Sequence, residues 1–470
     1  MEFTVKRKII GISSSINRFL YSVYYPAFVS LWAFFCFALK QQMLGLFVMI
    51  AVACLILIFN KDILPVLPLF ASCILTINRF QQLTNLPFII AYCVLGACFI
   101  YHFIKYPFKR FYLGKLFFPL CLVSFALFLG GILSRQGLNR YAYGLTVAFS
   151  TGPLVLVIYL LFINAIFASE KTNIPEYVCS ALISATVCAC FEIFFIYLTN
   201  VDIYFAIPQQ LERYTGWGNF NTVGAMTLIA IPLCCYIIVR TGKYAAMSVV
   251  ILFMIITDML CGSDGSLGII VFSLPFLVVF VFLNLKKCDR KHFISCVAVT
   301  VFILCTIGII IVIKVGFSEI MSYVTGRTDA HGRFSLYKRA LELFKSNPIV
   351  GIGQGYADES TEYLPTYNVH STVLHVMATM GIFGVIAYFI YFLFRFKILL
   401  GGTTPFNAFA YLSFIAFEAY GLIDMCEFIV IPLMSFITIV ILTAEVSNIK
   451  GEAPCLPLKT LYKRLNFYPL

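Results

Sequence analysis

Long apolar runs separated by short polar turns set the first limit on the fold of this chain. Hydrophobic residues make up 61% of its 470 residues and charged residues only 11%, whereas a soluble domain has about 25% charged residues. An apolar run of about twenty residues can cross a bilayer as a helix, and a helix satisfies its own backbone hydrogen bonds there. The sequence therefore predicts an all-α fold, a polytopic bundle of transmembrane helices.

Fourteen runs are candidate spans, and twelve spans is the alternative. The third run is short and contains Pro65 and Pro68, and the last two are interrupted by Asp424 and Glu427. The first run, without a following cleavage site, is expected to be a retained span. The expected spans are 20–39, 42–59, 63–77, 86–104, 115–133, 145–168, 175–199, 219–239, 244–261, 266–284, 293–313, 372–394, 404–423 and 427–446.

The distribution of basic residues predicts the orientation of the bundle. With the N-terminus in the cytoplasm, 22 of the 33 Lys and Arg residues lie inside and 11 outside. Six of the 11 outer ones fall in a single long loop. An excess of Lys and Arg in the inner loops is the rule for membrane proteins. The net charge of +12 is therefore explained by topology, and no nucleic-acid partner is expected.

The expected organisation is a single polytopic membrane domain, 1–470, with two outer elaborations and an inner tail. A short outer loop covers 200–218, a long outer loop covers 314–371, and a basic cytoplasmic tail covers 447–470. Most of the 17 cysteines fall in spans or on the inner side, where small apolar packing is the usual role. No disulfide is predicted.

Within the long outer loop, residues 334–346 have the pattern of an amphipathic surface helix. Tyr337, Leu341 and Phe344 recur at helical spacing on one face. Asn347-Pro348 ends the helix, and GIGQG follows it. No strand precedes these glycines and no helix follows them at once, so a nucleotide-binding loop is excluded. They are expected to permit tight turns or close backbone approach.

Two arginines and a histidine are the candidate chemical groups on the outer side. Arg333 stands where the surface helix begins, a position that favours a bound anion. Arg213 lies in the other outer loop, and each arginine could equally face lipid headgroups or water. His370 opens a span and has the side chain best suited to proton transfer near neutral pH. A plain polar cap at the membrane surface is its alternative role, and His375, five residues on, is interpreted as a packing or secondary contact.

Three acids fall inside expected spans, where ionisable groups are costly and are usually paired or functional. These are Glu192, Asp258 and Glu418. In a transporter they would form a cation path, and otherwise they could pair with arginines that line a polar cavity. The sequence has no HExxH, CxxC or Asp-x-Asp motif, so metal-independent chemistry without a cofactor is expected.

Three blocks of the chain resemble the O-antigen ligase and polymerase superfamily of bacterial membrane glycosyltransferases. They are RYTGWGNFNTVGAMTLIAIPL, GRFSLYKRALELFKSNPIVGIGQGY and VHSTVLHVMATMGIFGVIAYF, and together they cover roughly 200–395. The chain departs from the family in two places. Ser263-Asp264-Gly265 stands where members often have Ser-Arg-Gly, and His370-Ser371 stands where a His-Asn pair is usual.

The resemblance implies a metal-independent glycosyltransferase of the C type in the bacterial inner membrane, with both termini cytoplasmic. Its donor would be a glycan on undecaprenyl diphosphate and its acceptor a lipid-linked glycan, with membrane lipid and a chain-length regulator as further partners. Catalysis would fall to His370, Arg333 and Arg213. Substrate contacts are expected from Arg327, Arg339, Asn219, Asn221, Tyr337, His375 and Asp264, and Arg327 or Arg339 would replace the missing family arginine.

The function expected from these features is polymerisation of lipid-linked repeat units into a capsule, exopolysaccharide or O-antigen. One alternative is a ligase that moves the glycan onto lipid A core. The alternative of another class is a secondary transporter or flippase, which the buried acids favour. Against it, interrupted helices in matching halves of the chain, expected of many transporters, are not evident in the sequence.

Overall fold

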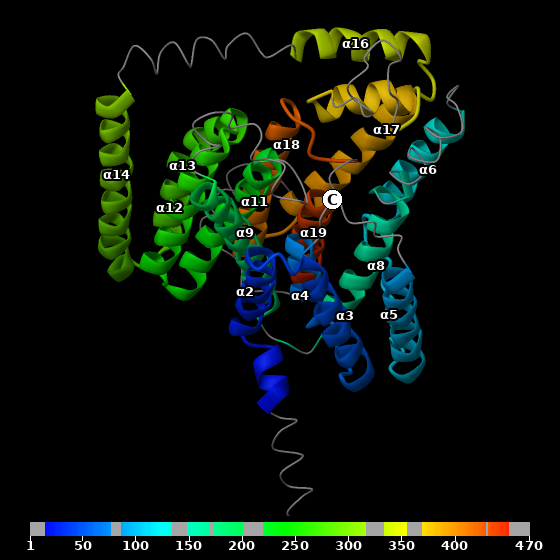
Figure 1. The fold of residues 1–470 in the computed structure, drawn as a ribbon, viewed down its shortest axis with the longest axis horizontal. Coiled ribbons are helices and arrows are strands. Elements are labelled where there is room, and N and C mark those ends of the chain that lie inside the picture. Colours follow the sequence, from blue (N-terminus) through cyan, green and yellow to red (C-terminus); the bar gives the residue numbers. More distant parts are fainter. Residues whose placement is uncertain are drawn as a thin grey trace, which may run out of the picture.

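The described residues of the chain form helices and no strand (Figure 1). The computed structural model describes residues 15–76, 86–108, 110–133, 148–149, 151–169, 171, 173–200, 220–315, 333–354, 369–428 and 431–450. Most of both outer loops and residues 451–470 of the tail, and with them Arg213, Asn219 and Arg327, lie outside these ranges.

Each expected span coincides with a helix in the described part of the chain. The helices are α2 (Tyr24–Ala38), α3 (Gln42–Phe59), α4 (Val66–Cys73) with the 3₁₀ turn η1 (Ile74–Thr76), α5 (Leu86–Lys105), α6 (Phe117–Leu133), α8 (Pro153–Ala168), α9 (Ile174–Thr199), α11 (Phe220–Thr241), α12 (Tyr244–Cys261), α13 (Asp264–Asn284), α14 (Lys287–Val315), α16 (Arg333–Ser346), α17 (Thr372–Leu400), α18 (Pro405–Gly421) and α19 (Ile431–Lys450).

Within the described residues, nine helices are long and apolar enough to cross a membrane, and four shorter apolar helices accompany them. The expected all-α polytopic bundle is therefore confirmed, and the chain is an integral membrane protein. The short pieces, such as α4, pack between longer helices. The described cysteines are all free, Cys261 and Cys426 among them.

Helix α11 is the centre of the bundle. Of the 18 consecutive residues that form its apolar stretch, 94% are buried. In the apolar stretch of α14, 6% of the residues are buried. Figure 1 shows α14 at the edge of the molecule. A helix that is apolar on every side yet buried must be surrounded by other helices, and an exposed one must face lipid. The bundle therefore places α11 among protein neighbours and α14 against the bilayer.

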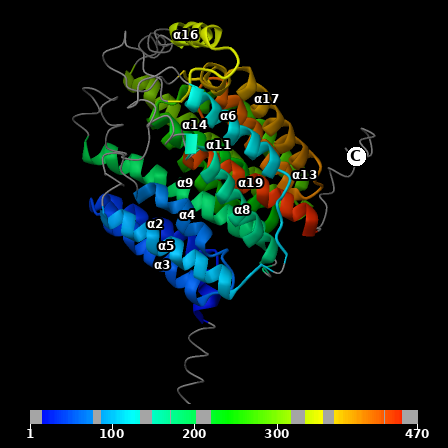
Figure 2. The same ribbon diagram turned by 90° about the vertical axis from the view of Figure 1, so that its right-hand side faces the viewer.

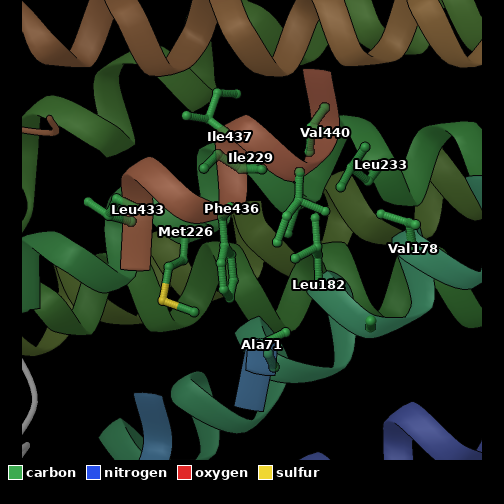
Figure 3. Packing of buried hydrophobic residues seen from close by; sticks show 14 of the residues in the cluster. Ala71, Val178, Leu182, Met226, Ile229, Leu233, Leu433, Phe436, Ile437 and Val440 are labelled. Atoms are coloured by element: carbon green, nitrogen blue, oxygen red, sulfur yellow. The ribbon is translucent and has the colours of Figure 1, made fainter. Parts of the chain in front are cut away.

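The core around α11 is built from aliphatic and aromatic side chains of four helices (Figure 3). These are Met226, Ile229 and Leu233 from α11, Leu433, Phe436, Ile437 and Val440 from α19, Val178 and Leu182 from α9, and Ala71 from α4. Helices in a membrane associate through close packing of this kind. The packing fixes α11, and thereby its first residues at one end of the bundle.

Helix α16 lies across that end of the bundle, over the start of α17 (Figures 1 and 2). Its buried face consists of Ala340 and Leu343, which pack with Ile352, Val369 and Ala378. Leu341, on the apolar face that the spacing indicates, is 41% exposed. The close contact with α17 is made by the small Ala340 instead.

Residues 348–353 complete the backbone hydrogen bonds of α17 where that helix is interrupted. Gly381 has φ 63° and ψ −161° inside α17. The amides of Ile382 and Phe383 donate instead to the carbonyls of Pro348 and Ile349, at 2.8 and 3.2 Å. Non-helical backbone at membrane depth is tolerated only where protein satisfies it. The glycine-rich segment thus makes the close backbone approach that its sequence predicted.

A second contact in the same segment uses two glycines with positive φ. Gly351 has φ 72° and Gly353 has φ 89°. The amide of Ile352 donates to the carbonyl of Ala378 at 2.9 Å, and that of Gly353 to Thr379 at 3.0 Å. Helix α17 is therefore an interrupted helix, although matching interruptions in two halves of the chain were not evident in the sequence. A lone glycine in an apolar run does not reveal an interruption.

A buried cluster of charged side chains holds the turn between α18 and α19. Arg395 of α17 is fully buried, and its Nη1 forms ion pairs with Glu418 at 3.0 Å and with Glu427. Its guanidinium carbon lies 3.9 Å from the centre of the Tyr391 ring. An unpaired charge would be costly in this setting. Glu418, one of the three acids placed in spans, therefore pairs with an arginine, and Glu427 attaches the turn to α17.

We predict that Gly351→Ala destabilises the protein. A β-carbon there would lie 2.3 Å from the carbonyl carbon of Thr379. The left-handed backbone alone costs a side chain about 1–2 kcal/mol, and the clash adds to it. The measurement is the unfolding temperature of the purified protein in detergent. Gly96→Ala, in an open helical position with nothing within 4 Å, is the control and should not lower that temperature. Equal effects would contradict the role assigned to the turn.

We also predict that Arg395→Met lowers stability by about 3–5 kcal/mol, since it leaves two buried carboxylates without a counter-ion. The double change Arg395→Met/Glu427→Gln should be less destabilising than the single change, because one carboxylate is removed with its partner. Thermal unfolding in detergent measures both. A double variant less stable than the single one would show that the pair does not couple.

Candidate functional site

The candidate site lies at the end of the bundle covered by α16 (Figure 1). The first residues of α11 and α17 meet there with the turn between α12 and α13 and with the turn that follows α18. These segments are far apart in the sequence, and buried polar side chains join them. The convergence of polar groups from several helices at one place in an apolar bundle marks a functional site.

The carboxylate of Asp424 is the centre of this site. His370 Nδ1 lies 3.0 Å from Asp424 Oδ1, and Asn221 Nδ2 donates to Oδ2 at 2.6 Å. The backbone amide of Met425 also donates to Oδ1, at 2.7 Å. The Asp424 side chain is only 9% exposed, so these donors replace the water that an ionised carboxylate needs.

Tyr420 extends the same network towards the turn between α12 and α13. Its hydroxyl donates to Asp424 Oδ2 at 3.3 Å and lies 2.9 Å from Ser263 Oγ. A phenol has one proton. When that proton points to Asp424, Ser263 is the donor to Tyr420. Ser263, in the Ser263-Asp264-Gly265 segment, is therefore linked to the Asp424 carboxylate through the hydroxyl of Tyr420.

The imidazole of His370 is held in one orientation and open on one side. An ionised carboxylate only accepts hydrogen bonds, so Nδ1 carries the proton towards Asp424 and a neutral ring has its lone pair on Nε2. None of the described residues hydrogen-bonds to Nε2, and the side chain is 30% exposed. The backbone of His370 has φ 50°, a left-handed conformation uncommon for a side-chain-bearing residue and frequent at functional sites.

Helix α16 is attached to this site by two side chains. Tyr337 Oη donates to the carbonyl of His370 at 3.1 Å, and Arg333 Nη1 donates to the carbonyl of Ile423 at 3.2 Å. Ile423 directly precedes Asp424, so Arg333 and His370 are tied to adjacent residues of one turn. A guanidinium has five N–H donors, and the bond to Ile423 engages one of them. The remainder can face an anion placed beside the imidazole.

The other residues expected at the site have different surroundings. Arg339 Nη1 pairs with Glu342 Oε2 at 3.1 Å. His375 is 2% exposed, and its Nε2 lies 3.0 Å from Gln354 Oε1. This contact joins α17 to the glycine-rich segment, one turn below His370. Asp264 begins α13 beside Ser263, close in sequence to the network. Of the expected residues, His370, Arg333, Tyr337 and Asn221 are the ones that these contacts bring together.

Ser371 stands where the asparagine of the family's usual His-Asn pair is expected. Its side chain accepts a hydrogen bond from the amide of Leu374 and so caps the first turn of α17. A capping hydroxyl satisfies one of the free donors at a helix start. The chain therefore keeps a polar group beside the imidazole, with a role in holding the helix end.

Asp424 and Tyr420 were not predicted as site residues. The sequence carried one usable signal, since Asp424 interrupts an apolar run at the end that the topology places beside His370. Such a polar residue at a span end also fits an ordinary turn. Only the contact across 54 residues distinguishes the two roles.

A comparison with known protein families finds a match for part of the chain. Residues 249–389 match the family model Wzy_C, described as O-Antigen ligase. The match includes Ser263, Arg333, Tyr337 and His370, and it supports an enzyme of the ligase or polymerase type that acts on lipid-linked glycans. No curated protein matches the chain at a significant level. The match of residues 249–389 to an O-antigen ligase domain supports the O-antigen ligase/polymerase superfamily.

Proposed function

We propose that this protein is a polysaccharide polymerase. It joins oligosaccharide repeat units carried on undecaprenyl diphosphate into a surface polysaccharide such as a capsule, exopolysaccharide or O-antigen. The observation that carries the proposal is the pairing of an Asp424-oriented imidazole with Arg333 across one turn. An oriented base beside a cation is what transfer from a diphosphate leaving group needs.

In the proposed reaction His370 Nε2 accepts the proton of an acceptor sugar hydroxyl. The hydroxyl oxygen then attacks the anomeric carbon of the donor glycan, and the bond from that carbon to the diphosphate oxygen breaks. The electron pair of that bond leaves with the lipid diphosphate. Asp424 stabilises the imidazolium that forms, because the Nδ1 proton already points to its carboxylate.

The departing diphosphate is neutralised by Arg333, with Arg213 as its expected partner. Cationic donors aimed at developing charge stabilise a transition state, and in a water-poor site they act more strongly than in water. The start of α16 adds the positive end of its helix dipole at the same place. Two arginines thus take the role that a divalent metal ion has in other enzymes that transfer from diphosphates.

The proposed orientation places the site on the outer face of the bacterial inner membrane, with both termini in the cytoplasm. The site lies at the end where α11 begins and α12 ends, and the basic turns near Arg240, Lys287 and Lys397 lie at the other end. Positive residues favour the cytoplasmic side. The lipid-linked donor and acceptor would therefore be presented on the opposite side of the membrane.

The description of the matching family favours a second candidate, an O-antigen ligase that transfers glycan to lipid A core. The donor chemistry is the same in both reactions, because a diphosphate leaves in each. The acceptor distinguishes them. A polymerase lengthens a lipid-linked glycan when it is given one substrate, whereas a ligase needs lipid A core as a separate acceptor.

The proposal is tested with the purified protein in liposomes that contain an undecaprenyl-diphosphate oligosaccharide, and product length is read on a gel. We expect the wild type to lengthen the lipid-linked glycan without added metal and in the presence of a chelator. His370→Asn should lower the rate on the order of 10²–10⁴-fold. Asparagine suits this replacement because it tolerates the left-handed backbone.

The arginine has a matched control on its own helix. Arg333→Ala should reduce turnover on the order of 10²-fold or more, while Lys338→Ala, at an exposed position of α16, should leave it unchanged. Equal losses in the two variants would show that only the surface charge of α16 matters. Solute movement across the liposomes without any glycan product would favour a transporter and overturn the proposal.

Asp424→Asn tests the orienting carboxylate separately. Asp424 contacts His370 and does not face the substrate, so we expect kcat to fall on the order of 10²–10⁴-fold with little change in KM. The pH dependence of kcat should change as well, since the imidazolium loses its carboxylate. A variant with lower protein stability but a normal pH profile and normal kcat per folded molecule would contradict this role.

A further inference from the structure

A cavity lined by charged and apolar side chains lies at the opposite end of the bundle from the candidate site. Its volume is about 970 Å³, in the range of small-molecule binding sites. It is formed where α3, α5 and α8 end and before α9 begins. The lining combines basic, aromatic and small apolar side chains, and none of the groups assigned to the proposed reaction belongs to it.

The charges around this cavity are mostly positive. Arg18, Lys61, Arg110 and Lys171 line it, and Asp62 is the acidic residue among its lining. The Asp62 carboxylate is already engaged within the protein. Its Oδ1 accepts from the amide of Leu64 at 2.8 Å and its Oδ2 from Ser169 Oγ at 2.6 Å. The cavity therefore has an excess of cations whose natural complement is an anion.

Lys171 is the cation of this group that is partly buried. Its ammonium donates to the carbonyl of Tyr21 and lies 4.1 Å from the centre of the Tyr177 ring. Burial lowers the pKa of Lys171 to about 8, although Asp62 and Glu176 oppose the change. The contacts made within the protein thus compensate the buried charge only in part. An anion in the cavity would supply the remaining stabilisation.

Exposed apolar side chains stand next to the lining residues in the sequence. Phe59, Ile104 and Phe111 are 75%, 76% and 57% exposed, and each lies within two residues of a lining residue. In an integral membrane protein such side chains face lipid tails. A ligand that fits both features has an anionic head and an apolar body.

The chain itself offers no acidic segment for this end of the bundle. Residues 1–14 contain Lys6, Arg7 and Lys8 against Glu2, and residues 451–470 contain Lys459, Lys463 and Arg464 against Glu452. Both segments are basic and would add to the positive charge. The occupant is therefore sought among the molecules that surround the protein in the membrane.

We infer that this cavity binds the phosphate-bearing headgroup of an anionic phospholipid. Arg18 and Arg110 hold the phosphate oxygens at the mouth, where the arginine fork is suited to bidentate contact. Lys61 and Lys171 add positive charge beside them, and the acyl chains lie along Phe59 and Ile104. This inference is independent of the reaction proposed above, because binding requires neither the glycan substrates nor the residues at the other end.

The test is lipid binding to the purified full-length protein in detergent, measured by native mass spectrometry and by the shift in unfolding temperature. Short-chain phosphatidylglycerol and phosphatidylcholine with the same acyl chains are compared. We expect phosphatidylglycerol to bind at least about tenfold more tightly, since each basic residue near a lipid surface contributes about fivefold in affinity. This preference should diminish as salt concentration rises.

Arg18→Gln/Arg110→Gln should abolish the preference for phosphatidylglycerol. Lys243→Gln/Lys287→Gln, which removes two charges at the same end but outside the cavity, should retain it. If the arginine pair does not elute as a folded protein, Lys61→Gln alone is measured and should weaken the preference about fivefold. The inference is overturned by equal binding of the two lipids or by equal losses in the two double variants.

Inorganic phosphate distinguishes the lipid from a soluble ligand. Competition by millimolar phosphate against phosphatidylglycerol supports recognition of the phosphate group. Binding of phosphate alone as tightly as of phosphatidylglycerol would show that the acyl chains contribute nothing, and would overturn the assignment to a lipid.

Discussion

The carboxylate of Asp424 is the interaction on which the arrangement of the candidate site depends. It joins three helices that apolar packing alone would leave free to slide, since it accepts from Asn221 of α11 and Tyr420 of α18 and holds His370 at the start of α17. A carboxylate that is buried near the end of a membrane-protein bundle needs hydrogen-bond donors from the protein. The hydrogen bonds to this carboxylate therefore fix the helix ends relative to one another. Glu427, three residues on, attaches the same turn to Arg395 inside the bundle.

The interruption of α17 determines where α16 can lie. At Gly381 the helix gives up its own hydrogen bonds, and the backbone of residues 348–353 replaces them. These residues directly follow α16, so the surface helix is tied to the span by main-chain bonds as well as by Ala340 and Leu343. Two sets of contacts therefore position Arg333. Backbone hydrogen bonds hold the end of α16, and the bond from Arg333 to the carbonyl of Ile423 holds its start. The cation is thus attached to the same turn as the imidazole, the arrangement on which the proposed reaction depends.

The sequence predicted the helices well because hydropathy acts locally. The predicted span 42–59 coincides with α3, and 175–199 differs from α9 by one residue, since both are continuous apolar runs with polar ends. The spacing predicted α16 as an amphipathic helix, but periodicity does not say that a small residue such as Ala340 will be buried against the bundle.

The network around Asp424 could not be predicted for a different reason. Its contacts join positions 54 and 203 residues apart, and no local pattern encodes such a distance. The interruption at Gly381 was missed in the same way, because its replacement partners come from another segment.

The backbone of His370 limits how the site can select its acceptor. A left-handed residue other than glycine costs about 1–2 kcal/mol, and it persists here because Tyr337 holds the carbonyl and Asp424 holds the ring. With both sides fixed, the direction of Nε2 cannot adapt to different acceptors. A hydroxyl must be brought to it by groups further out. In the proposed reaction the helix ends therefore determine the chemistry of transfer from the donor. The outer loops determine which acceptor is used. A polymerase and a ligase can then share one catalytic arrangement and differ only in the segments that present the hydroxyl.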